Sequence, residues 1–338
     1  MTGEGSSLRK RVGVVLFQLG GPDSLDAIEP FLYNLFCDPD IIDFPMAWIA
    51  RRALAKFISS RRSKKVAEHY SEIGGGSPIR FLTEAQGRAL EEALRPWIDA
   101  KTFLAMRYWH PLTNEAVVSL RRETYDQLVL LPLYPHYSYA TTRSSLREWD
   151  RQARNGLAGS GNLIESFYNH PLYIDAIGER INEKLAQLQS PEDVYFVFSA
   201  HGLPLKLVNA GDPYPQHIQE TMRLVLERGG WPNPRVLCYQ SRVGPQKWLE
   251  PSLTQTIERL AREGVKRMLV IPISFVTDHI ETLHEINIEA REEAEHLGVQ
   301  EFTMMGALND SPIFIRALAD VVLKAAGFAK GVSTPPNS

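Results

Sequence analysis

The chain has 338 residues, 44% hydrophobic and 23% charged, so it can bury a sizeable core and is not disordered as a whole. Its formal net charge of −3 gives no overall reason to expect nucleic-acid binding. Its two cysteines, Cys37 and Cys238, exclude a disulfide framework and a cysteine-rich zinc site, and they suit a reducing cytoplasm.

The termini give no sign of export or membrane insertion. Residues 1–11 are polar and basic, and no apolar segment with a small-residue cleavage site follows them, so no secretory signal is expected. No stretch approaches eighteen consecutive apolar residues, so none is expected to span a bilayer. We therefore expect a cytoplasmic protein, with a disordered tail over residues 326–338.

Short apolar runs rich in β-branched residues predict six strands. In chain order they are 12–19, 102–108, 127–133, 194–200, 235–241 and 267–273. Stretches with a helical pattern lie between or after them, at 77–98, 111–123, 172–189, 213–229, 251–263 and 278–297. Near-continuous apolar strands separated by helices indicate an α/β fold with parallel sheets covered on both faces.

This pattern runs twice along the chain. Three strands precede residue 135 and three follow residue 190, and each set ends in a proline-marked turn. We therefore predict two similar, doubly wound lobes, 8–165 and 166–311, with a cleft between them. A last helix, 312–325, is expected to pack back on the first lobe.

The stretch 41–65 combines apolar side chains with a strongly basic end. Its apolar members are Ile41, Ile42, Phe44, Met46, Trp48, Ile49, Leu54, Phe57 and Ile58. Seven basic residues follow from Arg51 to Lys65, and no acidic residue lies between Asp43 and Glu68. This pattern suits a helix lying on anionic lipid, peripheral on the inner face of the membrane. A helix that packs on its own lobe and solvates its basic end fits equally well.

Two glycine-rich loops resemble phosphate-binding loops only superficially. GGGSPI at 74–79 lacks the Lys-Ser/Thr ending of a P-loop, and QLGGPDS at 18–24 lacks the dinucleotide spacing. Nucleotide binding is therefore disfavoured, although both loops can bring backbone close to a flat ligand.

His201, in FSAHGLP at 198–204, follows directly on a strongly apolar strand. The end of a parallel strand is where an α/β active site is expected, and a histidine there acts as a base or a metal ligand near neutral pH. A buried histidine bonded to a carbonyl is the alternative interpretation.

A second chemical candidate is the acidic segment 275–289. Asp278 suits a helix N-cap, and Glu281, Glu285 and Glu289 then recur at four-residue spacing on one helix face. Like charges at this spacing destabilise a helix by about 0.2–0.5 kcal/mol per pair. No Lys or Arg lies within 275–290 to relieve the repulsion, so the ridge is a candidate guide for cations or protons. A solvated helix face is the alternative, and the neighbouring His279 favours function.

Aromatic side chains also gather near the predicted strand ends. They are Tyr70, Tyr108, Trp109, Tyr134, Tyr137, Tyr139, Tyr239 and Trp248. With Arg107, Arg143 and Arg242 nearby in the sequence, they would suit a large, flat, anionic ligand.

Eight ordered segments together resemble the ferrochelatase family over residues 12–325. They are LGGP (19–22), GGGSPI (74–79), MRYWHP (106–111), LYPHYS (133–138), FSAHGLP (198–204), GDPYPQ (211–216), QSRVGP–WLEP (240–251) and DHIETLHE (278–285). The resemblance implies two Rossmann-like lobes around a porphyrin cleft. It also implies a lyase that inserts Fe²⁺ into protoporphyrin IX, the terminal step of haem biosynthesis.

The resemblance also assigns roles to residues of this chain. It makes His201 the active-site histidine and Glu281 the glutamate across the porphyrin from it, with both as metal ligands. Asp278, His279 and Glu285 are the remaining acidic and imidazole groups of that wall. The positions that line the pocket or orient the macrocycle are Leu19, Tyr70, Arg107, Tyr108, Tyr134 and Trp248.

The chain departs from some relatives in two ways. Those relatives hold a [2Fe–2S] cluster with a C-terminal cysteine group and a further cysteine at the position of Tyr139, so no cluster is expected here. His284 stands where an aromatic residue is common. Iron is then a substrate, and no prosthetic group is expected.

Three functional alternatives stay open. They are insertion of iron into coproporphyrin III, insertion of cobalt or nickel into another tetrapyrrole, and non-enzymatic carriage of a tetrapyrrole or metal. The GGGSPI and QSRVGP segments favour the protoporphyrin enzyme by resemblance.

Overall fold

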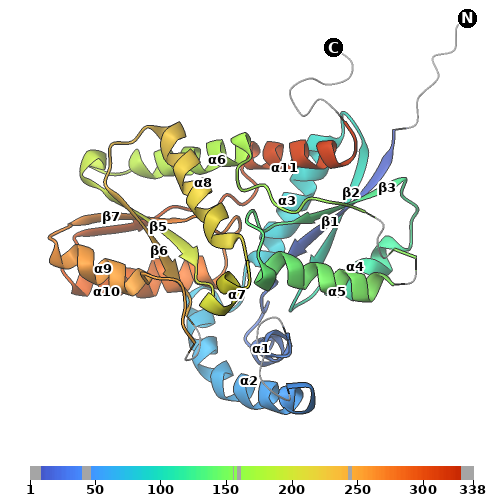
Figure 1. Cartoon of the computed structure of the whole chain (residues 1–338), viewed down its shortest axis with the longest axis horizontal. Coiled ribbons are helices and arrows are strands. Elements are labelled where there is room, and N and C mark those ends of the chain that lie inside the picture. Colours follow the sequence, from blue (N-terminus) through green and yellow to red (C-terminus); the bar gives the residue numbers. More distant parts are fainter. Residues whose placement is uncertain (1–8, 40–46, 155, 158–160, 243–245, 329–338) are drawn as a thin grey trace, which may run out of the picture.

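The computed structural model describes residues 9–39, 47–154, 156–157, 161–242 and 246–328. Predictions for the first residues of the 41–65 stretch and for 329–338 lie outside these ranges. The described chain forms two four-stranded sheets side by side, with helices above and below them and one helical pair projecting from the body (Figure 1).

Both sheets are parallel and have the same strand order. The first has the order β2-β1-β3-β4, from β1 (Arg11–Gln18), β2 (Asp99–Met106), β3 (Gln127–Pro132) and β4 (Asn162–Leu163). The second has the order β6-β5-β7-β8, from β5 (Tyr195–His201), β6 (Arg235–Gln240), β7 (Arg267–Pro272) and β8 (Glu301–Met304). The predicted repeat and parallel α/β class are therefore confirmed. In each sheet the chain first adds a strand on one side of β1 or β5 and then continues on the other side. Ligands of α/β proteins bind at the carboxyl ends of the strands where the strand order reverses in this way.

Two strands escaped prediction because they are short edge strands. β4 has two residues, both exposed, and β8 has four residues of which only alternate ones are buried. Neither can produce the continuous apolar run that marks a central parallel strand.

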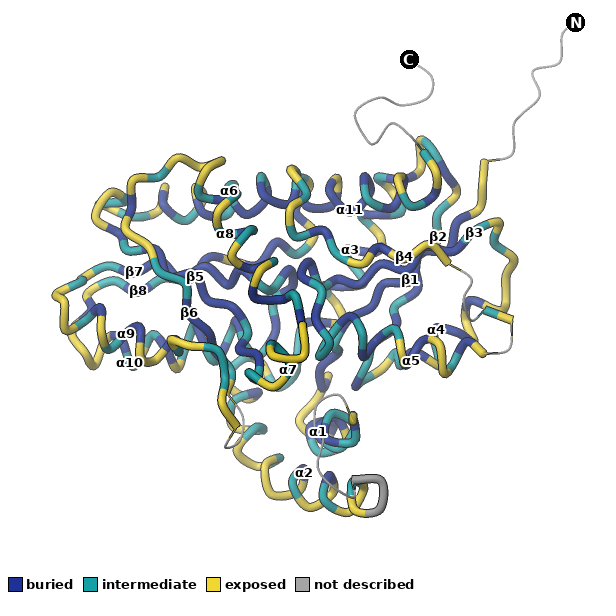
Figure 2. Tube along the Cα trace, in the orientation of Figure 1, coloured by how far each residue is buried: buried dark blue, intermediate teal, exposed yellow. Residues whose placement is uncertain are grey.

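One hydrophobic core runs along the same face of both sheets. Val12, Val14 and Leu16 of β1 share it with Phe196 and Phe198 of β5. The helices on this face are α3 (Ile79–Leu94), α6 (Pro171–Leu185), α8 (Tyr214–Gly229) and α11 (Pro312–Ala325). α11 contacts α3 of the first lobe and α6 of the second, so the two lobes are joined by packing (Figure 2).

The opposite faces of the two sheets have separate cores. Val15 and Phe17 of β1 point away from Val14 and Leu16, as the two-residue period of a strand requires. The first of these cores is covered by α4 (Thr113–Leu120) and α5 (Ser144–Ala153). The second is covered by α9 (Leu253–Arg262) and α10 (Arg291–His296).

The predicted helix 278–297 is present, but most of it is not the α-helix that the four-residue spacing of its glutamates implied. Residues Glu281–Ala290 form a π-helix, η3, and only Arg291–His296 continue as the α-helix α10. A second π-helical turn, η1 (Tyr139–Arg143), precedes α5. π-Helices are rare and often occur at functional sites.

α1 (Ile28–Phe36) and α2 (Ala47–Glu72) form the projecting pair. Their shared core includes Phe31 and Ala55, and it reaches Tyr70 and Tyr108 near the first sheet. α1, α5 and the short α7 (Leu205–Asn209) were not predicted. Among the described residues, no helix is both long enough and apolar enough to cross a membrane.

Candidate active site

His201 is the last residue of β5, at the point where the second sheet changes winding direction. Its backbone N–H donates to Ser274 Oγ, which follows β7, over 3.0 Å. Its backbone carbonyl accepts from the Tyr214 hydroxyl over 3.0 Å. These bonds fix the backbone, and the His201 side chain remains 40% exposed and available to a ligand.

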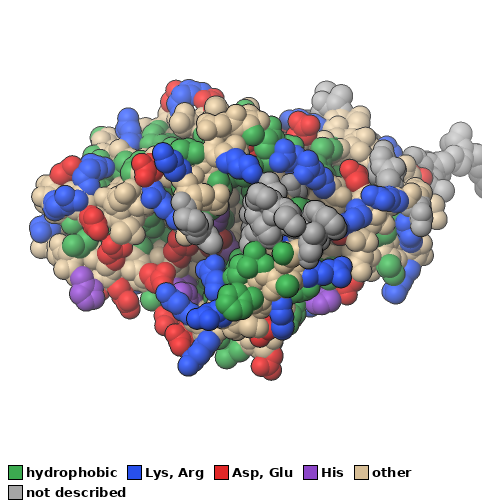
Figure 3. All heavy atoms as spheres, turned by 60° about the horizontal axis from the view of Figure 1, so that its bottom comes forward, with side chains coloured by type: hydrophobic (Ala, Val, Ile, Leu, Met, Phe, Trp, Pro, Cys, Tyr) green, Lys and Arg blue, Asp and Glu red, His purple; other side chains and the backbone are tan. Residues whose placement is uncertain are grey.

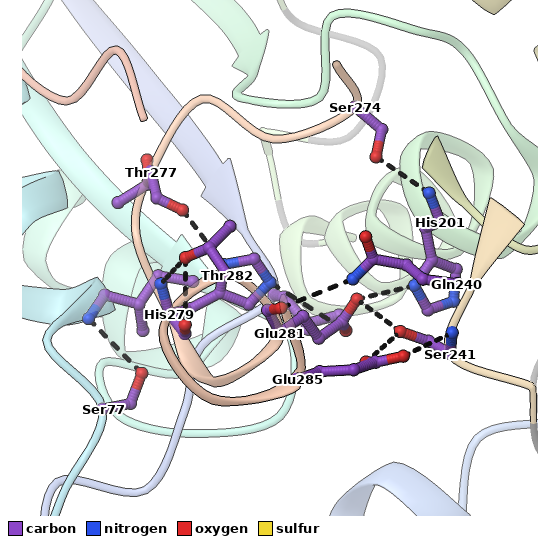
Figure 4. A network of polar contacts seen from close by, with 12 residues as sticks. Ser77, His201, Gln240, Ser241, Ser274, Thr277, His279, Glu281, Thr282 and Glu285 are labelled. Carbon is purple, nitrogen blue, oxygen red and sulfur yellow. Dashed lines mark hydrogen bonds and ion pairs between the residues drawn. The ribbon is translucent and has the colours of Figure 1, made fainter. Parts of the chain in front are cut away.

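The His201 side chain is paired with Glu281 at the start of η3. Nδ1 of His201 lies 2.7 Å from Glu281 Oε2 (Figure 4). The expectation that Glu281 faces His201 across the porphyrin is therefore wrong for this structure, because no ring fits between hydrogen-bonded atoms. Both groups belong to one wall, and the pairing leaves Nε2 of His201 as the nitrogen that can meet a proton or a metal.

Ser241 joins this pair to a second carboxylate. It follows β6 in a left-handed conformation, φ 63°, which is uncommon for a residue with a side chain. Its backbone N–H donates to Glu285 Oε1 over 2.7 Å. Its hydroxyl lies 3.1 Å from Glu281 Oε2 and also contacts Glu285 Oε2. Sequence reasoning missed Ser241, although it is the last residue of the predicted strand 235–241 and lies within QSRVGP.

The charges in this cluster depend on one another. Burial opposes ionisation of both His201 and Glu281, but their attraction outweighs it, so the pKa of His201 is raised and that of Glu281 is lowered to about 2. Burial and then the Glu281 charge raise the pKa of Glu285 to about 7. The wall thus combines a hydrogen-bonded histidine–carboxylate pair, in which Glu281 favours protonation of His201, with a carboxyl group that can exchange a proton near neutral pH.

His279 and Asp278 lie beside the pair but are held by other contacts. His279 Nδ1 donates to the Thr277 carbonyl over 3.0 Å, and Nε2 then faces Glu281 Oε1 at 3.9 Å. Asp278 does not cap the helix as predicted, since Ile280 holds that position. Its carboxylate instead accepts from Asn309 Nδ2 over 2.8 Å.

Glu289 does not join Glu281 and Glu285 at Ser241. It lies against His69 of α2 and against His284. The predicted ridge assumed α-helical geometry, but the i→i+5 bonding of a π-helix changes the angle between residues four apart.

The predicted pocket residues fall into two groups. Leu19, Tyr134 and Trp248 are partly exposed, and Leu19 and Tyr134 lie just beyond β1 and β3, where the first sheet changes winding direction. Tyr70 and Tyr108 are only 2% and 1% exposed, so they present little surface to a ligand in this structure, and their role in lining the pocket or orienting the macrocycle stays a prediction.

Arg107 is held by a buried network that sequence reasoning did not find. Its Nη2 lies 2.8 Å from Asp38 Oδ2, and its Nε donates to Ser144 Oγ over 3.0 Å. The Tyr108 hydroxyl donates to the same Asp38 oxygen over 2.6 Å. Asp38 is fully buried and follows α1, a helix that gave no recognisable sequence signal.

The duplicated parallel sheets, with an imidazole–carboxylate wall at a strand end, place this chain in the chelatase-like α/β class. A multi-domain Deinococcus radiodurans protein described as structurally similar to chelatases superposes with a TM-score of 0.52, over 96% of this chain and 56% of that one, at 16% identity. The cobalt-bound sirohydrochlorin chelatase SirB of Bacillus subtilis subspecies spizizenii gives a TM-score of 0.53 over 94% of this chain and 95% of that one, at 9% identity.

Within that class, the chain belongs to the ferrochelatase family, whose model matches residues 11–326. The Picosynechococcus ferrochelatase is 48% identical over 92% of this chain and 82% of its own length. The Citrifermentans bemidjiense ferrochelatase is 48% identical over 94% of this chain and 100% of its own length. The predicted family, its lyase activity in the terminal step of haem biosynthesis, and Fe²⁺ as a substrate are confirmed.

Proposed function

We propose that this chain inserts Fe²⁺ into protoporphyrin IX and uses His201, Glu281 and Glu285 to remove the two pyrrole protons. The observation that supports this proposal most directly is the connected chain His201–Glu281–Ser241–Glu285 at the end of β5. It provides one partly exposed imidazole, one fixed negative charge and one carboxyl group that titrates near neutral pH.

Metallation replaces two pyrrole N–H protons by one Fe²⁺ ion, so the protein must accept two protons and guide one cation. His201 Nε2 accepts a proton from the ring, and Glu281 stabilises the imidazolium that results. The Ser241 hydroxyl contacts both carboxylates and offers a route for a proton from Glu281 to Glu285. His279 and Asp278 support this wall, with His279 Nε2 aimed at Glu281.

The same two groups suit the incoming iron. Neutral imidazole and carboxylate are both common ligands of divalent iron, and the His201 side chain is backed by a carboxylate that fixes its orientation. Metal contact and proton uptake thus occur on one face of the macrocycle. Leu19, Tyr134 and Trp248 provide the partly exposed apolar surface against which the ring would lie.

Arg107 acts in this proposal as a positioning residue. Its guanidinium is paired with fully buried Asp38, so it fixes the chain after β2 rather than binding a substrate carboxylate directly. No iron–sulfur cluster is included, because Cys37 ends α1 and Cys238 lies within β6, in separate hydrophobic clusters.

An anaerobic metallation assay tests the substrate assignment. The full chain is mixed with Fe²⁺ and either protoporphyrin IX or coproporphyrin III, and product formation is followed by absorbance. We expect a higher kcat/KM with protoporphyrin IX. Preference for coproporphyrin III would overturn the porphyrin assignment, faster insertion of Co²⁺ or Ni²⁺ into another tetrapyrrole would favour a different chelatase, and binding without turnover would indicate a carrier.

We also propose that the outer face of α2 contacts anionic lipid, which would place this protein in the cytoplasm and peripherally on the inner face of the membrane. One side of α2 packs on α1, where Ala55 shares a core with Phe31, and Ser59 of α2 is also buried. The other side presents Phe57, which is 59% exposed, with the Arg61 guanidinium 5.5 Å from its ring. Hydrophobic side chains ringed by basic ones are visible on this part of the molecule (Figure 3).

Flotation with phosphatidylglycerol vesicles at low and high salt tests this contact. We expect the chain to float at low salt and to be released by salt, since each basic residue near anionic lipid contributes about 1 kcal/mol. Lys64→Glu combined with Lys65→Glu should abolish flotation, whereas Arg259→Glu combined with Arg262→Glu on α9 changes net charge equally and should not. No flotation at low salt, or equal loss in both double variants, would contradict the proposal.

A further inference from the structure

A second cluster of metal-ligating side chains lies between α2 and η3. His69 comes from α2, whereas His284 and Glu289 come from η3. One ligand atom from each of these three residues lies within 4.8 Å of the other two. His69 Nε2 is 3.7 Å from Glu289 Oε1, and His284 Nδ1 is 3.8 Å from Glu289 Oε2.

The imidazole rings of His69 and His284 lie against each other, and a nitrogen of each is close to Glu289. They stack with their centroids 4.2 Å apart and their planes only 12° from parallel. Because an imidazole binds a metal ion in its own ring plane, one of the two rings must turn about its Cβ–Cγ bond for both nitrogens to reach the same ion. Four-coordinate binding of a metal at bonds of about 2.0–2.2 Å would bring such ligand atoms roughly 3.3 Å apart, a small closure from the distances seen.

Glu72 fixes the proton of the buried histidine on the far side of its ring. His284 Nε2 lies 3.1 Å from Glu72 Oε2, and the His284 side chain is only 4% exposed. Since a carboxylate accepts, Nε2 carries the hydrogen in the neutral ring, and the Nδ1 lone pair then faces Glu289. A carboxylate behind a histidine in this way is the usual outer shell of a histidine bound to a metal.

Among the described residues, the charged side chains that act on His69 are Glu289, Glu72 and Lys65, so two carboxylates stand against one ammonium group. Glu72 and Glu289 are its carboxylates, and their side chains are 52% and 48% exposed, so water can complete a coordination shell. The His284 Nδ1 lone pair and the Glu289 carboxylate thus face each other without a proton between them, an arrangement that a bound cation relieves.

We propose that His69, His284 and Glu289 form a binding site for a first-row divalent transition-metal ion, with Glu72 as the outer partner of His284. Two imidazole nitrogens select ions of borderline softness such as Zn²⁺ or Co²⁺ over Mg²⁺ and Ca²⁺, which prefer oxygen. The site is distinct from the His201–Glu281 pair. Because it joins α2 to η3, the bound ion would anchor the projecting α1–α2 pair to the second lobe.

The test uses the full-length His201→Ala chain, in which the His201–Glu281 pair is disabled, and Co²⁺ or Zn²⁺ as the probe. Equilibrium dialysis with 1 mM Mg²⁺ present (about a thousandfold above the probe) should show one bound ion per chain, and Co²⁺ should raise the melting temperature. Adding His69→Gln should remove that ion and that thermal shift. Adding Glu72→Gln should weaken Co²⁺ binding by about 10–100-fold, as loss of an outer-shell partner does.

Control variants show whether a loss of metal binding is specific to the proposed ligands. His110 pairs with Glu115 over 2.7 Å at the surface without a second histidine, so adding His110→Gln should leave binding unchanged. His69 is partly exposed and His69→Gln is expected to fold, which melting in EDTA checks directly. Unchanged stoichiometry and affinity in both the His69→Gln and Glu72→Gln backgrounds, or equal competition by Mg²⁺, would overturn the proposal. Neither outcome bears on porphyrin metallation by the unaltered chain.

Discussion

We expect His201→Ala to lower the metallation rate by about 10²–10⁴-fold, the range that a positioned acid–base group contributes. The reason is geometric, since the His201 side chain is 40% exposed and its Nδ1 is occupied by Glu281, which leaves Nε2 to meet the ring. Porphyrin binding should stay close to that of the unaltered chain, because the apolar surface of the pocket is intact. Anaerobic turnover and porphyrin fluorescence titration measure the two properties separately.

His296→Ala is a suitable control for this experiment, since His296 is exposed on α10 and contacts only the Glu292 carbonyl. It should turn over normally. Near-normal turnover in His201→Ala would remove this residue from the mechanism, and a parallel loss of porphyrin binding would assign it to the pocket instead.

The second large effect is expected at the carboxylates that follow His201. Glu281→Gln removes the negative charge that stabilises the His201 imidazolium, and we expect turnover to fall by about 10–100-fold while the chain remains folded. Glu285→Gln should also lower turnover, because the acceptor with a pKa of about 7 is lost. Thermal unfolding measured beside kcat distinguishes a chemical effect from a structural one.

Stability against pH provides an independent test of Glu285. Its folded-state pKa of about 7 lies above the ordinary value of 4.5, so between these pH values the folded chain binds more protons than the unfolded chain. The free energy of unfolding must then fall as pH rises through this window. Glu285→Gln should lessen that fall. A variant with full activity and much lower stability at every pH would mark the carboxylate as structural.

Much of the fold could be predicted from local sequence patterns, because the central strands are marked by short apolar runs. A buried parallel strand must be apolar on both faces, so β1, β3, β5 and β7 could be recognised from short runs. The same runs located His201, since a polar residue directly after such a strand lies at the edge of the sheet where ligands bind. Edge strands β4 and β8 lack that pattern, and α1 has no boundary signal.

The contacts around His201 were decided by tertiary structure. Glu281 is 80 residues from His201 in the chain and Ser241 is 40 from Glu281, so only the packing of β5, β6 and η3 makes them neighbours. The residue pattern alone also failed to distinguish a π-helix from an α-helix, because the four-residue spacing of Glu281, Glu285 and Glu289 fits one face of an α-helix. That difference separates Glu289 from Glu281 and Glu285 and places it against His69 of α2. The sequence alone thus predicted the two lobes, the central strands and the family. Which partner each acidic side chain contacts depended on long-range packing, which no local pattern encodes.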